Sequence, residues 1–375
     1  MGKAAIENVP RYFAPHINDC FHNGYGAILS FLNQNPDIIL ADYLSFMYDS
    51  STGFIGVTFY YRHSVSVEFS EEELNTSMEF VYLPGTAVYD PETISSKDFS
   101  TKDKVNINMF IHDETEVAYS RLKELIDGGS PVMLVVDLYY MPFHRAYQKD
   151  HGLHCIVVTG YDEEEGTLDV FDKYRLSSSD FDGKLPMSVV RDGRCSDNPL
   201  SNAMAGSYKR PIRNLWMEVN VNKDFKVDES KIFNVFSESC MRMTGNKQVL
   251  GDVCGLAKLE EFRNDLLKKK EAIDEKTLFY FRTYLNGSFK NIARQRKRFG
   301  VFINEVSASL PQSSVKEITE LIAQSSTNWD ICANVAYKFG ITKTLSLIDD
   351  LYSRLGNIIE IEKEITKKLS NIEQK

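Results

Sequence analysis

Short apolar runs separated by polar turns fill the middle of the chain. One run covers 132–136, behind a glycine and a proline, and a second covers 155–158. Apolar runs of this length, bounded by turn residues, are typical of buried strands. The acidic turn 162–166 separates the second run from a third at 167–171. This pattern predicts an antiparallel hairpin whose loop has about five residues.

The register of this hairpin decides whether two polar side chains can meet. If Tyr161 pairs with Thr167, His154 lies opposite Tyr174, and Asp172 is its diagonal neighbour on the same face. A slip of one residue would place His154 and Asp172 on opposite faces of the sheet. We therefore expect His154 and Asp172 to lie within reach of each other only in this register.

Other segments up to residue 222 predict further short elements. The segments 53–69 and 75–90 carry the β-branched and aromatic residues of strands, and 116–126 has the apolar spacing of a helix. The segment 215–221 predicts a closing strand. The segment 186–211 is rich in Ser, Asn, Gly and Pro, and it predicts a long loop.

The pattern changes after about residue 225, where helical periodicity dominates and proline becomes scarce. We expect helices near 229–242, 256–270, 275–307, 313–324, 328–338 and 343–372, with Gly287 as a possible break in the third. The sequence therefore predicts an α+β domain over residues 1–222, followed by an all-α helical bundle over residues 223–375.

A cysteine lies at the predicted start of an early helix. Asn18 and Asp19 are N-cap candidates, and Tyr25 and Ile28 after Cys20 have helical spacing. A helix N-terminus favours the thiolate form of a cysteine. The order Cys, His, Asp along the chain is that of papain-like thiol enzymes, whose three residues meet only in the fold. The alternative is a buried structural cysteine.

Several motifs resemble the N-terminal domain of the butirosin biosynthesis protein H family, a relative of the C39-like, papain-fold cysteine peptidases. Within 128–172 they are GGSPVMLVVDL, YYMPF, HGLHCIVVTGYD and VFD, and upstream they are His16 and Cys20 followed by a helix. The sequence RQRKRFGVFINEVSA at 294–308 resembles the helical domain that often follows in this family.

The resemblance implies a papain-like (C39-like) domain in which Cys20 is the nucleophile, His154 the general base and Asp172 the orienting acid. Papain-like enzymes usually carry a Gln six residues before the nucleophile as an oxyanion donor, and this chain has Ala14 there. The nearby candidates for that donor are Asn18, His16 and the backbone N–H of Cys20. The family also commonly has Gly after the nucleophile, where this chain has Phe21.

The resemblance further implies acyl transfer. The family's namesake moves an acyl group from the phosphopantetheine thioester of a carrier protein to an amine. We therefore expect a natural-product (antibiotic) enzyme that holds no cofactor itself and acts with an acyl or peptidyl carrier protein. Its acceptor would be a small amine, a diamine or an aminoglycoside-like molecule. Four aromatic residues precede His154: Tyr139, Tyr140, Phe143 and Tyr147. They would line the acyl channel, or else belong to a loop packed on the second domain.

Two other classes of function stay open. A hydrolase of the same fold, cleaving a peptide, an amide or a thioester, would use the same three residues with water as the acceptor. A non-catalytic binding protein would keep the fold without a reactive thiol.

Composition and charge narrow the setting. The chain has 375 residues, of which 43% are hydrophobic and 12% aromatic, enough for real cores. Its net charge of −10 argues against nucleic-acid binding and favours a cationic substrate. Six cysteines without paired spacing indicate reduced thiols in a cytoplasm. No stretch approaches a membrane span, and no second ligand cluster accompanies His151, His154 and Cys155, so we expect neither a membrane nor a metal site.

An acidic carrier protein would need a local basic patch on this acidic chain. The two candidate patches are Lys209, Arg210 and Arg213, and Arg294, Arg296, Lys297 and Arg298, the second of which has a solvated helix face as its alternative. The helical domain would shape the acceptor pocket, bind the carrier or form a homodimer.

Overall fold

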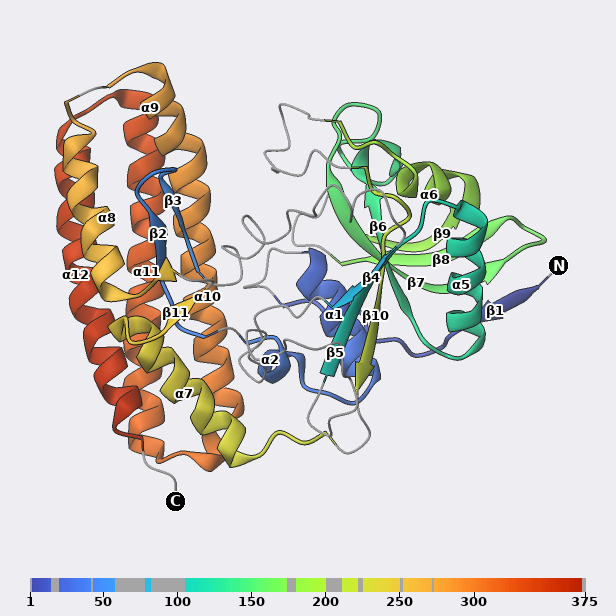
Figure 1. The fold of residues 1–375 in the computed structure, drawn as a ribbon, viewed down its shortest axis with the longest axis horizontal. Coiled ribbons are helices and arrows are strands. Elements are labelled where there is room, and N and C mark those ends of the chain that lie inside the picture. The colour runs from blue at the N-terminus through green and yellow to red at the C-terminus, as the bar shows by residue number, and fades with distance from the viewer. Residues whose placement is uncertain are drawn as a thin grey trace. The chain divides into compact units, whose positions relative to one another are not determined.

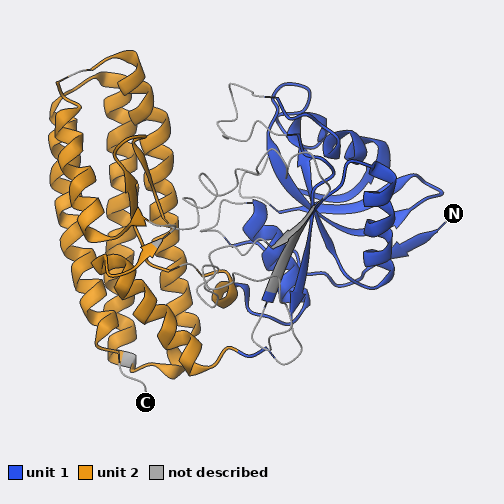
Figure 2. Ribbon diagram, in the orientation of Figure 1, with its two compact units in different colours: residues 1–36, 68–84, 94–226 blue, residues 37–67, 85–93, 227–375 orange. Residues whose placement is uncertain are grey.

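The computed structural model describes residues 2–14, 20–41, 43–57, 78–81, 105–173, 180–199, 211–221, 225–249, 252–271 and 273–372. These residues form two compact units (Figure 2). The first unit contains the described residues before 37, residues 78–81, and those from 105 to 226. The second contains those from 37 to 57 and from 227 onward. The second unit thus includes residues 37–57, which were expected in the first domain.

The first unit is built on one antiparallel sheet, which in the described part of the chain has eight strands (Figure 1). The strand order is β4-β5-β10-β6-β7-β8-β9, and β1 pairs with β7. In chain order the elements of this unit are β1 (Lys3–Ala5), α1 (Cys20–Phe31), β4 (Met78–Val81), β5 (Val105–Ile111), α5 (Thr115–Asp127), β6 (Val132–Asp137), the 3-10 turn η1 (Leu138–Tyr140), β7 (Leu153–Asp162), β8 (Thr167–Asp172), β9 (Phe181–Pro186), α6 (Met187–Arg194) and β10 (Trp216–Val221).

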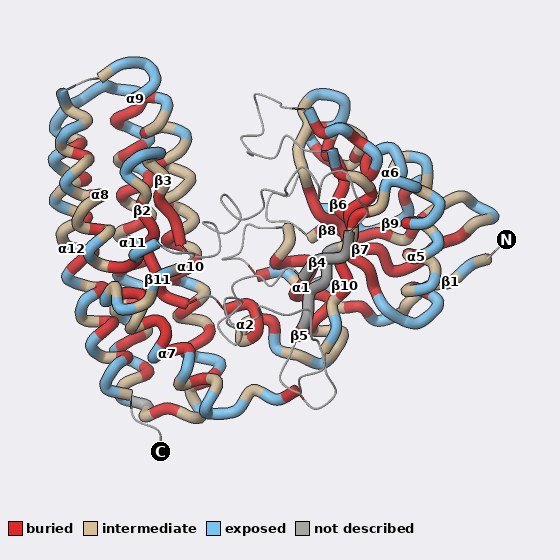
Figure 3. Tube along the Cα trace, in the orientation of Figure 1, coloured by how far each residue is buried: buried red, intermediate tan, exposed pale blue. Residues whose placement is uncertain are grey.

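The central strands are buried on both faces, because helices cover both (Figure 3). A Cβ added at Gly24 of α1 would lie 2.2 Å from Sδ of Met133 in β6, so α1 packs directly on that face. Leu122 of α5 and Val190 of α6 belong to the same core cluster as Leu134, the next residue of β6. Since successive side chains of a strand point to opposite faces, α5 and α6 cover the other face.

The hairpin of β7 and β8 has the expected register only beyond an irregularity. At the turn, Tyr161 pairs with Leu168, so the predicted Tyr161–Thr167 pair is wrong by one residue. The register then shifts between Val158 and Gly160, and Val158 pairs with Val170 as expected. The extra residue is a β-bulge, which places two residues of one strand opposite one of its partner.

Glycine is required at the bulge. A Cβ at Gly160 would lie 2.4 Å from Oδ2 of Asp169 and 2.9 Å from the carbonyl oxygen of Ala4 in β1. The Ile6 N–H, just after β1, donates to the carbonyl oxygen of Thr159 at 2.7 Å. The N-terminal strand therefore runs directly alongside the bulge.

The second unit is a helical bundle, so the expected order of an α+β part followed by an all-α part is confirmed. Its elements are α2 (Pro36–Ile39, at the boundary), β2 (Met47–Asp49), β3 (Phe54–Gly56), α7 (Glu229–Thr244), β11 (Gln248–Val249), β12 (Asp252–Val253), α8 (Leu256–Lys268), α9 (Glu275–Phe279), the π-helical segment η2 (Tyr280–Leu285), α10 (Asn286–Glu305), the 3-10 turn η3 (Ser307–Ser309), α11 (Gln312–Thr342) and α12 (Ser346–Ser370).

Residues 43–57 fill part of the bundle core. Phe46 stacks on Trp329 of α11 with ring centroids 5.8 Å apart, and Ile55 belongs to the same buried cluster. The amide nitrogen of Gln295 donates to the carbonyl oxygen of Tyr43 at 2.8 Å. This segment is therefore integral to the packing of the helical unit.

Four expected elements differ from those observed. The predicted loop 186–211 contains α6, and 215–221 forms an internal strand between β5 and β6 instead of a closing one. The two helices expected over 313–338 are one helix, α11. Gly287 lies inside α10, and the irregular segment of that long helix is η2, just before it. Of the strands expected at 53–69 and 75–90, residues 58–77 and 82–90 lie outside the described residues.

The basic cluster on α10 is not a free surface patch. Arg296 is 1% exposed, and its Nε and Nη2 donate to the two carboxylate oxygens of Glu362 at 2.8 and 2.9 Å. The Arg298 guanidinium donates to the carbonyl oxygen of Leu40, and Lys297 pairs with Asp330 at 2.9 Å. In the other expected patch, Lys209 and Arg210 lie outside the described residues, and Arg213 pairs with Asp113 at 2.7 Å.

Candidate functional site

A histidine and a carboxylate at the ends of neighbouring strands form the centre of the site. The Nε2 atom of His154, near the start of β7, lies 2.7 Å from Oδ2 of Asp172, the last residue of β8. Both residues are buried, at 5% and 4% exposure. Buried charged groups are stable only when they are paired and hydrogen-bonded, and this pair meets that condition.

The third expected residue, Cys20, meets the same histidine. Burial by itself would lower the pKa of His154, but the charges of Asp172 and Cys20, together with hydrogen bonds to both side chains, raise it well above 6.5. Asp172 contacts the ring through Nε2. The structure thus brings Cys20, His154 and Asp172 together around one imidazole.

The position of Cys20 follows from helix α1, of which it is the first residue. Asn23, one turn further on, donates from Nδ2 to the carbonyl oxygen of Lys173 at 2.9 Å, directly after Asp172. The start of α1 is therefore tied to the end of β8. Cys20 is partly exposed, whereas His154 and Asp172 are buried. Of the three residues, Cys20 is the most exposed.

A second histidine, His144, lies inside the site. His144 is 6% exposed, and its ring centroid is 5.9 Å from that of His154. Its Nδ1 accepts the N–H of Ala146 at 3.1 Å, which leaves the ring proton on Nε2. Burial and the neighbouring His154 lower the pKa of His144 to about 4. His144 is therefore a neutral donor beside His154 at neutral pH.

Asp137, at the end of β6, organises the loop that leads to His154, although no functional role was expected for it. Its carboxylate is fully buried and accepts the backbone N–H groups of Tyr139 and Gly152, each at 3.0 Å. The same carboxylate contacts Nδ1 of His151 and the hydroxyl of Ser196, each at 2.6 Å. Gly152 precedes His154 by two residues, so Asp137 fixes the entry into β7. A carboxylate that directly follows an apolar strand was the available signal.

The aromatic residues expected to contact substrate have different surroundings. Tyr139 stacks on His151 with centroids 4.4 Å apart, and Phe143 stacks on Phe181 of β9 at 4.6 Å. Tyr140 packs against the core beneath α5 and α6, whereas Tyr147 is 37% exposed. Tyr140 and Phe143 thus have packing partners within the first unit, and a substrate contact for the four residues stays a prediction.

The expected oxyanion donors His16 and Asn18 lie outside the described residues. Ala14, which stands where papain-like enzymes have a Gln, is buried. Phe21 packs toward Tyr25 on α1 with ring centroids 6.2 Å apart.

Neither a metal-ligand cluster nor a membrane-spanning helix is present in the described segments. There, no group of three or more His, Cys, Asp or Glu side chains is arranged to hold a metal ion. Nor does any of the helices they form combine the length and apolar character that crossing a membrane requires.

The comparison with known proteins agrees with the motifs. Residues 38–173 match the family model described as "Butirosin biosynthesis protein H, N-terminal". The match includes His154 and Asp172, and it begins after Cys20. No curated protein matches the chain. Over residues 38–173 the chain is thus similar to the butirosin biosynthesis protein H family, which confirms the resemblance seen in the sequence.

Proposed function

We propose that the protein is a cysteine-dependent acyltransferase that moves an acyl group from a carrier-protein thioester to an amine. The observation that carries the proposal is the convergence of Cys20 and Asp172 on the two sides of the His154 ring. A nucleophile next to a base, with the base oriented by a third group, is the arrangement that covalent acyl transfer requires.

In the first half of the reaction, the Cys20 thiolate attacks the carbonyl carbon of the thioester, and the carbon–sulfur bond to phosphopantetheine breaks. His154 gives its Nδ1 proton to the departing thiolate, and Asp172 keeps the ring oriented through Nε2. The result is an acyl group on Cys20. The backbone N–H of Cys20, at the start of α1, supports the negative oxygen that forms during the attack.

In the second half, an amine attacks the acyl-enzyme carbonyl and forms the amide. His154 takes the proton that the amine loses, and the Cys20 thiolate is released. A site that favours amine over water must position the amine and restrict water. The burial of His154 and His144 limits the access of water to the base.

The match over residues 38–173 supports an enzyme of a biosynthetic pathway, since the matching family is described by butirosin biosynthesis. We extend this to antibiotic or related natural-product assembly, with a phosphopantetheine thioester on a carrier protein as donor and a small amine as acceptor. The order of Cys20, His154 and Asp172 along the chain, which is that of papain-like enzymes, also supports the proposal. A peptidase, amidase or thioesterase with the same three residues is the alternative.

Intact-protein mass spectrometry tests the chemistry. The wild type is mixed with short acyl-phosphopantetheine thioesters and with acyl-carrier protein, beside Cys20→Ala and Cys195→Ala. Cys195 is an exposed thiol, so Cys195→Ala controls for non-specific acylation. We expect an acyl adduct in the wild type and in Cys195→Ala, absent in Cys20→Ala, that disappears when an amine is added and yields the amide.

Two other results would redirect the assignment. Loss of the adduct to water at an equal rate with and without amine would indicate a hydrolase. No adduct from either donor, or an adduct of equal yield in Cys20→Ala, would overturn the proposal.

A further inference from the structure

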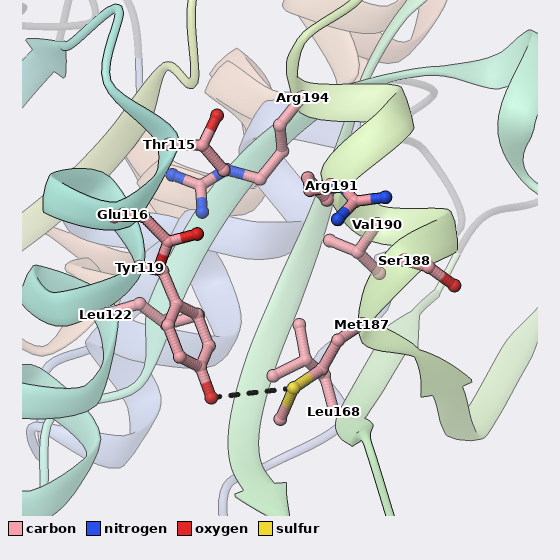
Figure 4. Close-up of a pocket in the computed structure, with 10 residues that line it drawn as sticks. All are labelled: Thr115, Glu116, Tyr119, Leu122, Leu168, Met187, Ser188, Val190, Arg191 and Arg194. Carbon is pink, nitrogen blue, oxygen red and sulfur yellow. Dashed lines mark hydrogen bonds between the residues drawn. The ribbon is translucent and has the colours of Figure 1, made fainter. Parts of the chain in front are cut away.

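A pocket between α5 and α6 is separate from the Cys20 site (Figure 4). Its volume is about 210 Å³, and its lining includes Leu168 of β8 but none of the residues that surround His154. Leu168 and Asp172 are four residues apart on β8, roughly 13 Å along a strand. The pocket therefore offers a binding site that catalysis at Cys20 does not use.

The pocket contains a buried cation without an anionic partner. Arg194, the last residue of α6, is 4% exposed and lines the pocket. Its Nη2 donates to the carbonyl oxygen of Asn214 at 3.0 Å, and its buried Nε has no hydrogen-bond partner. Among the described residues, no carboxylate forms an ion pair with Arg194. Burial lowers the pKa of its guanidinium to about 10, so the group stays charged at neutral pH.

The backbone around Arg194 is fixed in place. The Asn214 N–H donates to the Arg194 carbonyl oxygen at 2.9 Å, which complements the bond from the guanidinium to the Asn214 carbonyl. Next to it, the Cys195 thiol lies 3.1 Å from the hydroxyl of Thr115 at the start of α5. A charged group that is already held in position loses little conformational freedom when a ligand binds.

The rest of the lining is mostly apolar. Leu122, Leu168 and Val190 are buried core residues, and the Tyr119 hydroxyl donates to Sδ of Met187 at 3.5 Å across the pocket (Figure 4). A ligand that suits this lining has a short apolar chain in addition to its negative group.

Two exposed charges complete the pocket, and they bear on the charge of the ligand. Arg191 adds a second cation to the lining, and Glu116 adds a carboxylate (Figure 4). A carboxylate in the same lining repels a group with two negative charges, such as phosphate, more than a group with one.

We propose that the pocket between α5 and α6 is a second ligand site, which binds a small monocarboxylate with its carboxylate on Arg194 and its apolar chain against Leu122, Leu168 and Val190. Arginine binds a carboxylate through paired N–H donors, and the Arg194 Nε is a donor without a partner. The inference does not depend on the reactivity of Cys20.

Methyl NMR titration of the full chain, labelled at Leu, Val and Met, tests the inference. The probes are hexanoate, its uncharged analogue hexanamide and inorganic phosphate. We expect saturable hexanoate shifts at Leu122, Leu168, Met187 and Val190, and binding of hexanamide and phosphate at least about tenfold weaker. In Arg194→Met, hexanoate should also bind at least about tenfold more weakly, whereas Lys184→Gln, which removes an exposed cation outside the pocket, should stay within about threefold.

Each contrary result overturns the inference. Hexanamide or phosphate binding as tightly as hexanoate would exclude a site for monocarboxylates. Unsaturable hexanoate shifts in the wild type would exclude a site altogether. Unchanged affinity in Arg194→Met, with unaltered methyl shifts in the second unit as proof of folding, would exclude Arg194. If Arg194→Met does not fold, the hexanoate–hexanamide comparison in the wild type decides.

Discussion

Nε2 of His154 and Oδ2 of Asp172 lie 2.7 Å apart because β7 contains one extra residue, Thr159, which has no partner in β8. If the pairing seen at the turn continued without the bulge, Asp172 would lie opposite Val157. Its side chain would then point to the opposite face of the sheet from that of His154. The bulge restores the register in which the two side chains share a face. A local irregularity therefore decides whether this imidazole has a carboxylate partner.

Substitution of Gly160 tests the importance of the bulge. In Gly160→Ala, the new Cβ would approach the Ala4 carbonyl oxygen to 2.9 Å, so β1 or the bulge must move. We expect a loss of about 1–3 kcal/mol in the free energy of unfolding, measured by urea denaturation. Gly183→Ala on β9 is the control, since its Cβ would meet no atom closer than 3.5 Å. Equal losses in the two variants would contradict a special role for the bulge.

Removing the charge of Asp172 should weaken the reactivity of Cys20. In Asp172→Asn, His154 loses its anionic partner, and its imidazolium no longer supports the Cys20 thiolate. We expect turnover to fall on the order of 10²-fold or more, with residual activity, and iodoacetamide alkylation of Cys20 at neutral pH to slow. His151→Asn is the matched control, because it removes another His–Asp contact, between the half-buried His151 and Asp137. A similar loss of alkylation in both variants would count against the Cys20–His154–Asp172 assignment.

The raised pKa of His154 also gives a pH dependence of stability. A histidine whose pKa is raised by folding stabilises the protein fully below its unfolded pKa of about 6.5, and this contribution is lost as the pH rises through the folded pKa. We therefore compare the Cys20→Ala protein with the Cys20→Ala, Asp172→Asn double variant. The difference between their free energies of unfolding should be larger at pH 6 than at pH 9. Urea denaturation at the two pH values measures it, and a gap that widens with pH would contradict the pairing.

His144 should have the opposite effect. Its folded pKa of about 4 lies below the usual 6.5, so the unfolded chain takes up a proton first as the pH falls. We expect the wild type to lose about 1–2 kcal/mol of stability between pH 7 and pH 5 through this residue alone. His144→Asn keeps an acceptor for the Ala146 N–H and should reduce that loss. Identical pH profiles for wild type and variant would show that His144 is not the buried neutral group described above.

The Arg296–Glu362 pair should dominate the stability of the helical unit. Trp329 and Ser325 also donate to the Glu362 carboxylate, at 3.0 and 2.8 Å. Glu362→Gln would leave the buried Arg296 uncompensated, at an expected cost of about 3–5 kcal/mol in urea denaturation. Asp330→Asn, which breaks the exposed pair with Lys297, should cost about 0–1 kcal/mol. A small loss in Glu362→Gln would indicate that Arg296 finds another partner.

The acidity of Glu362 fits this role. Burial alone would raise its pKa, but the charge and hydrogen bonds of Arg296, aided by Trp329 and Ser325, lower it below its usual value. The stabilisation is therefore present above about pH 4.5 and is lost as the pH falls through the folded pKa.

Sequence patterns predicted the elements whose periodicity is strong. The apolar runs at 132–136 and 155–158 became β6 and β7, and the helix expected at 116–126 became α5. The bulge at Thr159 had no such signal, because Thr fits a regular strand equally well. The diagonal relation of His154 and Asp172 was nevertheless expected correctly, since the bulge cancels the error of one residue at the turn.

Misplaced boundaries arose where tertiary contacts satisfy side chains that usually end a helix. The sequence from Ser325 to Asn328 indicates a break, but Ser325 donates to Glu362 and Ser326 donates to the carbonyl oxygen of Ala293 at 2.9 Å. These partners come from other helices, so no local pattern reveals them. The burial of His144 and of Arg296 was missed for the same reason.

The membership of residues 37–57 in the helical unit also limits how the protein can be divided. A fragment that ends near residue 226 would keep Phe46 and Ile55 but lose the helices that cover them, and the exposed apolar side chains would favour aggregation. A fragment that starts near residue 227 would lack Phe46 and Ile55, and its core would have a cavity where these side chains pack. Because part of the helical unit precedes most of the first unit along the chain, a single genetic crossover near residue 226 would not transfer the helical unit whole.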